Sequence, residues 1–297
     1  MTVSSSNKKT KDLCLIYSIY LLAFAIAAAV AAVAGTAATA VLVFDVVATV
    51  VVFIGSVALH NSSVYDPYWS VTPMVIAAWL YCCYDCWDIW HIVVLVALFA
   101  WGIRLTLNWQ KNTTGLDWED WRYRNYRDNN GPFMWFILNF FGIHMMPTLL
   151  VFAGLIPLMT IVTVPLNAWC LVGVAIMLAG ALLEHLADTH MRAFLQATKD
   201  SKERTTCRTG IWRLSRHPNY LGEIMFWWGL AAVYFSASPV VAEPLFWVKG
   251  LGGAVAMFLL FECISIPLME KRQLARRSDY RDYQRTTSRL FLLPPRK

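Results

Sequence analysis

Long runs of apolar residues, each about the length of a membrane-crossing helix, dominate this chain of 297 residues. A helix needs roughly 20 apolar residues to cross the hydrocarbon core of a bilayer. Only 15% of the residues are charged, whereas a soluble domain carries about a quarter. The apolar runs predict spans near residues 13–34, 37–59, 71–87, 89–107, 133–162, 168–187, 221–238 and 245–267. The sequence therefore predicts an all-α fold, a polytopic integral membrane bundle of seven to eight transmembrane helices.

Two of these runs contain residues that interrupt a straight membrane helix. Asp85 and Asp88 end the third run, which leaves a re-entrant segment as an alternative to a full crossing. The fifth run is long and contains Pro147 and Pro157, so we expect it to be kinked or tilted. The predicted number of crossings is eight, or seven together with a re-entrant pair.

The distribution of positive charge predicts the orientation of the chain. All of the 25 lysine and arginine residues except Arg104 and Lys249 fall in the N-terminus, in 108–132, in 188–220 or after residue 268. With eight spans these four segments share one side, which the positive-inside rule places in the cytosol. We therefore expect both termini in the cytosol. The membrane would be the endoplasmic reticulum in a eukaryote, or the inner membrane in a bacterium.

The excess of basic residues and the seven cysteines both have ordinary explanations. Topology and attraction to anionic membrane lipids account for most of the formal net charge of +6. Nucleic acid is not an expected partner, because the basic residues lie in loops between spans and form no recognisable module. Cys82, Cys83 and Cys86 lie in an apolar segment without a nearby histidine pair, which favours small hydrophobes over metal ligands. We predict no metal site.

The most informative polar segment begins at Arg216 and ends at Glu223, where a basic loop runs into an apolar span. A carboxylate one helical turn inside a membrane is costly unless it has a partner or a proton, so Glu223 is a functional-site candidate. Asn219 and Glu223 are four residues apart and share a helix face. With His217 and Tyr220 they form a candidate polar wall for a ring that bears an amide or carbonyl. The alternative is a helix start with interfacial anchors.

Polar residues near the ends of three other spans are further candidates. Glu184, Asp188 and Arg192 fall on one helical stripe, which could bind a ribose and a phosphate or could be a solvated charge ladder. Arg104 lies inside a span, where it could snorkel to the interface or pair with a carboxylate or a pyrophosphate. Asp66 is a possible acid in an aromatic segment of the kind that forms interfacial belts.

At these residues the chain resembles the membrane steroid 5-alpha-reductase family, and within it the group designated DUF1295. The resemblance is carried by Asn219 to Glu223 at the head of a late span and by Asp188 and Arg192 before it. A basic, tyrosine-containing tail that ends in Leu292-Leu293-Pro294 adds to it. The resemblance covers roughly residues 65–295.

The resemblance implies a fold, a cofactor and a reaction. An N-terminal pair of transmembrane helices would occupy 1–64, and a catalytic membrane domain would occupy 65–297. NADPH would bind with its nicotinamide deep in the bundle and its phosphates at the cytosolic loops. The enzyme would reduce a carbon–carbon double bond conjugated to a ketone in a lipid or steroid-like substrate. An acid would polarise the ketone while hydride goes to the beta carbon. We expect a monomer.

The resemblance also assigns roles to residues. The implied catalytic residues are Asp66, which aligns with the ketone-polarising acid, and Glu223, which with Asn219 would hold the nicotinamide end. The rest of the cofactor would be bound by Arg104, Asp188, Arg192, Arg216, His217, Tyr220, Arg272 and Tyr283. Two positions depart from the family pattern. Trp101 stands at the position of the tyrosine that assists the acid. Glu184 stands where the steroid enzymes have an asparagine, and its carboxylate disfavours an extra phosphate, so NADH stays an alternative to NADPH.

Two other functions are compatible with the same residues. An isoprenylcysteine-carboxyl-methyltransferase-like enzyme shares the Arg-His-Pro-x-Tyr element at 216–220 and uses S-adenosylmethionine. That family expects a Glu-Glu pair in the tail, whereas here Glu270 is followed by Lys271. The third possibility is a non-catalytic membrane protein whose polar groups bind lipid headgroups. A Rossmann cofactor domain is not expected, because no Gly-x-Gly-x-x-Gly follows a strand.

Overall fold

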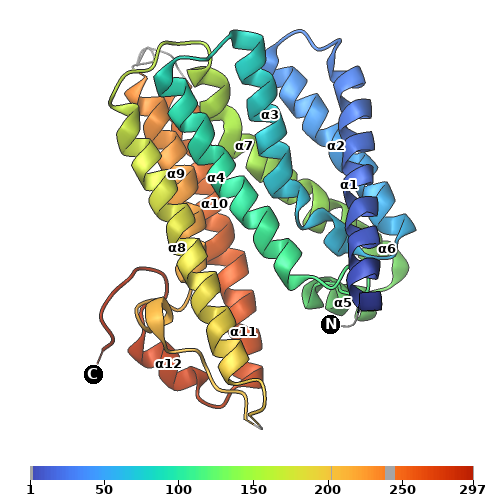
Figure 1. The fold of residues 1–297 in the computed structure, drawn as a ribbon, viewed down its shortest axis with the longest axis vertical. Helices are drawn as coiled ribbons and strands as arrows, with labels where there is room; N and C mark the ends of the chain where they lie inside the picture. The colour runs from blue at the N-terminus through green and yellow to red at the C-terminus, as the bar shows by residue number, and fades with distance from the viewer. Residues whose placement is uncertain (1–2, 202, 238–244, 297) are drawn as a thin grey trace. The chain divides into compact units, whose positions relative to one another are not determined.

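A computed structural model describes residues 3–201, 203–237 and 245–296. Throughout these ranges the chain forms helices joined by turns and loops, without a strand (Figure 1). The prediction of an all-α protein is therefore confirmed.

Within the described ranges, six helices are long and apolar enough to cross a membrane. They are Asn7–Ala31, Ala37–Ala58, Ile89–Asn112, Pro132–Ile161, Cys170–Ala197 and Phe246–Arg276. Each overlaps a run predicted from the sequence, and Cys170–Ala197 and Phe246–Arg276 extend beyond the predicted 168–187 and 245–267. The chain is therefore a multi-pass membrane protein. The other two predicted spans correspond to shorter helices of 17 and 19 residues, α3 (Tyr68–Tyr84) and α9 (Pro218–Ser236). The count of seven to eight stays a prediction. So does the orientation, and the connection at 238–244 expected on the non-cytosolic side lies outside the described residues.

The two aspartates that interrupt the third apolar run each occupy a helix end. Asp85 follows α3 in the left-handed conformation, with φ of 53°, and its N–H donates to the Tyr81 carbonyl. The side chain of Asp88 accepts the N–H of Trp90 at 2.9 Å at the start of α4 (Ile89–Asn112). These aspartates therefore end one helix and begin the next.

The chain divides into two compact units, which are described separately. The first consists of Met1–Cys86 and Leu105–Thr163, and the second of Trp87–Arg104 and Val164–Lys297. The division falls inside α4. The predicted boundary between an N-terminal helix pair and a catalytic domain is a different division, and it stays a prediction.

The first unit is a packed helical group with an aromatic core. Its elements are α1 (Val3–Ala31), α2 (Ala37–Ala58), η1 (Ser62–Tyr65), α3, α5 (Trp121–Asp128), α6 (Pro132–Ile137), η2 (Leu138–Met145) and α7 (Met146–Ile161). Helix α1 packs along α2, and α7 contacts both α2 and α3. Tyr20, Tyr65 and Tyr68 are buried together with Ala48 and Val52 in this core.

The fifth predicted span is not a regular α-helix throughout. A π-helical segment, η2, connects α6 to α7, and Pro147 lies in the first turn of α7. The wider π turn shifts the hydrogen-bonding pattern by one residue. Pro157 lies inside α7, where it removes a backbone donor.

The second unit contains the elements that position most of the predicted site. They are the first part of α4, α8 (Cys170–Ala197), η3 (Gly210–Arg213), α9, α10 (Phe246–Leu260), η4 (Phe261–Ser265), α11 (Ile266–Arg276) and α12 (Tyr280–Thr286). Helix α9 packs against both α8 and α10 (Figure 1). The contact between α8 and α9 is very close, because glycines face backbone across it. A Cβ atom added to Gly222 would lie 2.6 Å from the Gly180 carbonyl oxygen and 2.5 Å from Glu184 Cγ.

We expect Gly222→Ala to lower the melting temperature of the purified protein. The added methyl group would collide with backbone that cannot move without separating α8 from α9, and overpacking of this kind costs about 1–3 kcal/mol. Gly142→Ala is the matched control, because nothing lies within 4 Å of a Cβ atom there. Equal melting temperatures for the two variants would contradict the close packing at Gly222.

Candidate functional site

Arg104 of α4 lies against two acidic residues of α8 within the second unit. Its guanidinium forms an ion pair with Glu184 and a second with Asp188, with Nη1 at 3.0 Å from Asp188 Oδ2. Only 12% of the Arg104 side chain and 4% of the Glu184 side chain are exposed. Glu184 and Asp188 are one helical turn apart, so both carboxylates reach the same planar guanidinium. The sequence left two roles open for Arg104, snorkelling to the interface or pairing with an anion. In the structure Arg104 is paired with carboxylates.

The carboxylate of Glu223 is held by two indoles. Trp101 Nε1 donates to Glu223 Oε2 at 3.0 Å, and Trp227 Nε1 donates to Oε1 at 2.8 Å. The Trp101 ring also stacks on Phe226, with centroids 4.1 Å apart and planes inclined by 9°. Glu223 is buried, and the partner that the sequence required for it is thus supplied by the protein. Trp101, which stands at the expected tyrosine position, is one of the two donors.

The Arg104 ion pairs and Glu223 belong to one electrostatic cluster. Glu184 interacts electrostatically with Arg104, Asp188 and Glu223. The Arg104 guanidinium therefore interacts with the carboxylates of Glu184, Asp188 and Glu223. Arg104 Nε and Glu184 Oε1 are both buried and have no hydrogen-bond partner among the described residues. This leaves one donor and one acceptor that can bind a further polar group, so the residues present fit a polar ligand.

The Arg216–His217 element docks the C-terminal segment of the chain. Arg216 Nε donates to Glu270 Oε1 at 2.7 Å, and His217 Nε2 lies 3.1 Å from the same oxygen. Gln284 Nε2 donates to Glu270 Oε2 at 2.8 Å. Burial lowers the pKa of His217, against the opposing effect of Glu270. The predicted cofactor residues Arg216 and His217 thus make contacts that attach α11 and α12 to the start of α9.

The other predicted cofactor residues are distributed along the second unit. Tyr220 stacks on His217, with centroids 5.4 Å apart, and Asn219 is half-buried in the same helical turn. The Tyr283 hydroxyl donates to the Ser215 carbonyl at 3.1 Å, within the tail contact. Arg192 Nη2 donates to Thr189 Oγ1 at 3.3 Å near the end of α8. Arg272 lines a groove at the end of α11. The structure therefore groups Arg104 and Asp188 with Glu223, and it groups Arg216, His217, Tyr220 and Tyr283 around the tail.

Asp66, the predicted acid, lies in the first unit directly after η1. The Tyr123 hydroxyl donates to Asp66 Oδ1 at 2.8 Å. Burial raises the pKa of Asp66 to about 7; Asp120 adds to the rise and Arg122 opposes it. A carboxyl group with this pKa can hold and release a proton near neutral pH, which suits a general acid.

A second buried polar cluster of the first unit was not among the sequence predictions. The Tyr68 hydroxyl donates to Asp45 Oδ1 at 3.3 Å, and Thr49 Oγ1 donates to the Tyr68 hydroxyl at 3.3 Å. The Thr49 and Thr148 hydroxyls are 2.8 Å apart. Asp45 Oδ2 and His144 Nε2 are buried without a hydrogen-bond partner in the described part of the chain. The sequence feature that could have indicated this cluster is Asp45, an acidic residue in the middle of an apolar run.

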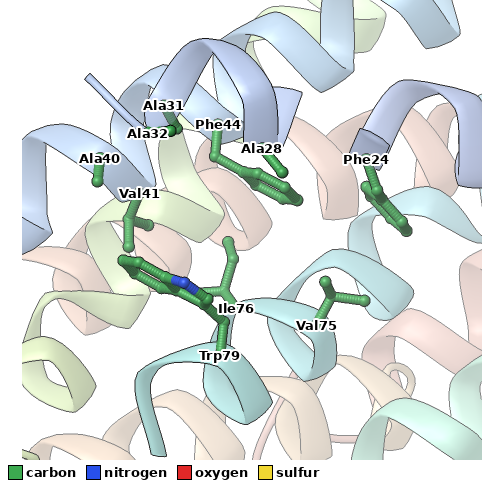
Figure 2. A pocket seen from close by; sticks show the side chains of 10 residues that line it. All are labelled: Phe24, Ala28, Ala31, Ala32, Ala40, Val41, Phe44, Val75, Ile76 and Trp79. Carbon is green, nitrogen blue, oxygen red and sulfur yellow. The ribbon is translucent and has the colours of Figure 1, made fainter. Parts of the chain in front are cut away.

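The first unit also has an apolar pocket, whose lining comes mainly from α1, α2 and α3 (Figure 2). Its volume is about 320 Å³, and it is lined by Phe24, Ala28, Ala31, Ala32, Ala40, Val41, Phe44, Val75, Ile76 and Trp79. The Phe24 ring contacts the Tyr68 ring, with centroids 6.1 Å apart. A hydrocarbon group fits such a lining, because almost no polar atom faces the space.

Comparison with known protein families gives one match. The profile of DUF1295, described as a protein of unknown function, matches residues 52–287. This range includes Asp66, the Arg104 ion pairs and Glu223, and it leaves Asp45 outside. A comparison with curated proteins and a comparison with solved structures gave no match.

Proposed function

Because the chain belongs to the DUF1295 family, we propose that it is a membrane oxidoreductase that reduces a carbon–carbon double bond conjugated to a ketone. The observation that carries the proposal is the buried cluster of Arg104, Glu184, Asp188 and Glu223 inside membrane helices. Charged groups at such depth are expensive and mark functional sites by default. The resemblance to steroid 5-alpha-reductases supplies the reaction class.

NADPH is the proposed cofactor, and it would supply the hydride. Arg104 Nε and Glu184 Oε1 offer a buried donor and a buried acceptor to its polar groups. Glu223 already accepts from two indoles, but each carboxylate oxygen has a further lone pair for the amide of a nicotinamide. Arg192 and Asn219 lie on the same two helices, α8 and α9, and we assign them to the cofactor as well.

Asp66 is the proposed acid. In its protonated form it would donate to the ketone oxygen as negative charge develops there, and it would then lose its proton to that oxygen. A pKa of about 7 keeps much of the acid protonated at neutral pH. The apolar pocket beside Phe24 and Phe44 is a candidate for the hydrocarbon body of a lipid or steroid-like substrate.

The finer topology belongs to the same proposal. We infer seven or eight crossings, with α3 and α9 as the shorter ones, and both termini in the cytosol. The protein would act as a monomer in the endoplasmic reticulum membrane or in a bacterial inner membrane. The concentration of basic residues in four segments of the sequence supports this orientation.

Cofactor binding tests the proposal directly. The purified protein is titrated with NADPH, NADH and S-adenosylmethionine while its melting temperature is followed. A ligand that binds only the native state stabilises it by about 2.7 kcal/mol at 100 times its Kd, so NADPH is expected to raise the melting temperature. If neither nicotinamide nucleotide changes it at millimolar concentration, the oxidoreductase assignment is wrong.

One observation favours a second function, methyl transfer from S-adenosylmethionine. Arg216 and His217 belong to the Arg-His-Pro-x-Tyr element that this chain has in common with isoprenylcysteine-carboxyl-methyltransferase-like enzymes. Both side chains contact the Glu270 carboxylate of the tail. A rise in melting temperature with S-adenosylmethionine alone would support methyl transfer. No response to any of the three compounds would favour the lipid-binding alternative.

A further inference from the structure

A basic groove lies at the C-terminal ends of α8 and α11 in the second unit, and none of the Arg104 cluster residues lines it. Its volume is about 630 Å³. The charged residues that line it are Lys199, Glu203, Arg204, Arg272, Arg276 and Arg277. Five positive charges thus face one negative charge. Arg272 was predicted from the sequence to bind the cofactor, and the other charged side chains have no role in the proposed reaction.

The nearest acidic residues of the tail have hydrogen-bond partners outside the groove, and Asp279 also interacts electrostatically with Arg277 of the groove. Asp279 accepts from the Thr206 N–H at 3.0 Å and from the Thr206 hydroxyl at 2.6 Å. Asp282 accepts from Arg208 at 2.9 Å. These contacts hold the 203–208 loop against the tail, and they leave Glu203 as the acidic side chain that lines the groove. The groove therefore keeps a positive charge that an anion can balance.

The position of the groove indicates the kind of anion. Two membrane helices, Cys170–Ala197 and Phe246–Arg276, end at its walls, which places it where a hydrocarbon core gives way to headgroups. Phe194 and Leu195 also line it, and Leu195 is 51% exposed. A ligand that combines phosphate with acyl chains matches both features.

We propose that this groove binds the phosphate headgroup of an anionic phospholipid. Arginine and lysine bind phosphate through charge-assisted hydrogen bonds, and each basic residue near an anionic membrane surface strengthens attraction by about fivefold. The lipid headgroup would lie between the C-terminal ends of α8 and α11. The proposal can be tested apart from the reaction, because the Arg104 cluster does not line the groove and the variants below leave Arg272 unchanged.

The test uses the full chain in detergent, titrated with short-chain phosphatidylglycerol or phosphatidylcholine while its melting temperature is followed. Phosphatidylglycerol is expected to stabilise the wild type, and phosphatidylcholine is not. The double variant Lys199→Gln/Arg276→Gln, which keeps side-chain size, should weaken the phosphatidylglycerol response by about 25-fold in concentration, fivefold for each charge. Lys271→Gln is the matched control, because this exposed lysine is on the same helix and outside the groove.

Three outcomes would overturn the proposal. The first is an equal response to the two lipids. The second is an equal loss of response in the control variant, which would indicate non-specific attraction to the tail. The third is displacement of phosphatidylglycerol by pyrophosphate or NADPH at concentrations where the lipid is bound, which would assign the groove to a soluble phosphate. Retention of the NADPH response by the groove variant shows that it is folded and separates this proposal from the proposed reaction.

Discussion

Replacing Arg104 with alanine is expected to lower the melting temperature of the protein on the order of 10 °C. The change leaves Glu184, which is 4% exposed, and Asp188 without their cation. Removing one partner of a buried ion pair costs about 3–5 kcal/mol, because the remaining charge stays desolvated. Each kcal/mol corresponds to roughly 2–4 °C in a protein of 150–250 residues. Thermal denaturation of the purified variant in detergent measures the effect.

A second substitution distinguishes uncompensated charge from lost side-chain packing as the cause of the lower melting temperature of Arg104→Ala. Glu184→Gln in the Arg104→Ala background removes the uncompensated carboxylate, so we expect it to recover part of the lost stability. Arg213→Ala is the control, because Arg213 is an exposed arginine of the same unit. A melting temperature for Arg104→Ala equal to that of the control would contradict the buried ion pairs.

Asp66→Asn is expected to reduce turnover of an enone lipid on the order of 100-fold or more, with NADPH binding unchanged. An amide keeps the shape of the side chain and cannot deliver a proton to the ketone oxygen, and the loss of one group that stabilises an oxyanion has an effect of this size. Glu223→Gln should do the reverse, weakening the NADPH response in thermal titration more than it lowers turnover at saturation. Wild-type rates in both variants would show that the site is misplaced.

The pH profile gives an independent measure of the Asp66 role. With a pKa of about 7, the acid is protonated below neutral pH and ionised above it. Turnover should therefore be level at low pH and fall about tenfold for each pH unit above 7. The residual turnover of Asp66→Asn should not show this fall above pH 7. Asp117→Asn is the control, since the Asp117 side chain is 64% exposed and pairs with Lys8.

The sequence predicted the helices well because hydrophobic length is a local property. The run at 37–59 became α2 (Ala37–Ala58), and the run at 133–162 became the continuous helix Pro132–Ile161. Asp85 and Asp88 were recognised as an interruption, and they occupy a helix end and a helix start. The number of crossings was harder, because α3 and α9 are near the minimum length and α9 carries Glu223.

The pairing of side chains was less accessible, because periodicity does not say which faces of which helices meet. Arg104 and Glu184 are 80 residues apart in the chain, and Trp101 and Glu223 are 122 apart. Nothing in the sequence near Gly222 indicates that Glu184 Cγ and the Gly180 carbonyl of α8 lie beside it. Asp45 was not among the predicted site residues although it interrupts an apolar run, because part of its cluster, such as Thr148, lies about a hundred residues further along the chain.

Arg104 and Glu184 are 80 residues apart in the chain, so they are synthesised and enter the membrane at different times. A ribosome adds roughly 5–20 residues each second, so the guanidinium leaves the exit tunnel about 4–16 s before its carboxylate partner. During that interval α4 holds an unmatched arginine, and insertion of an arginine at the centre of a span costs about 2.5–3.5 kcal/mol. Stable insertion of α4 is therefore expected to be less favourable until α8 has entered the membrane and its carboxylates compensate the arginine.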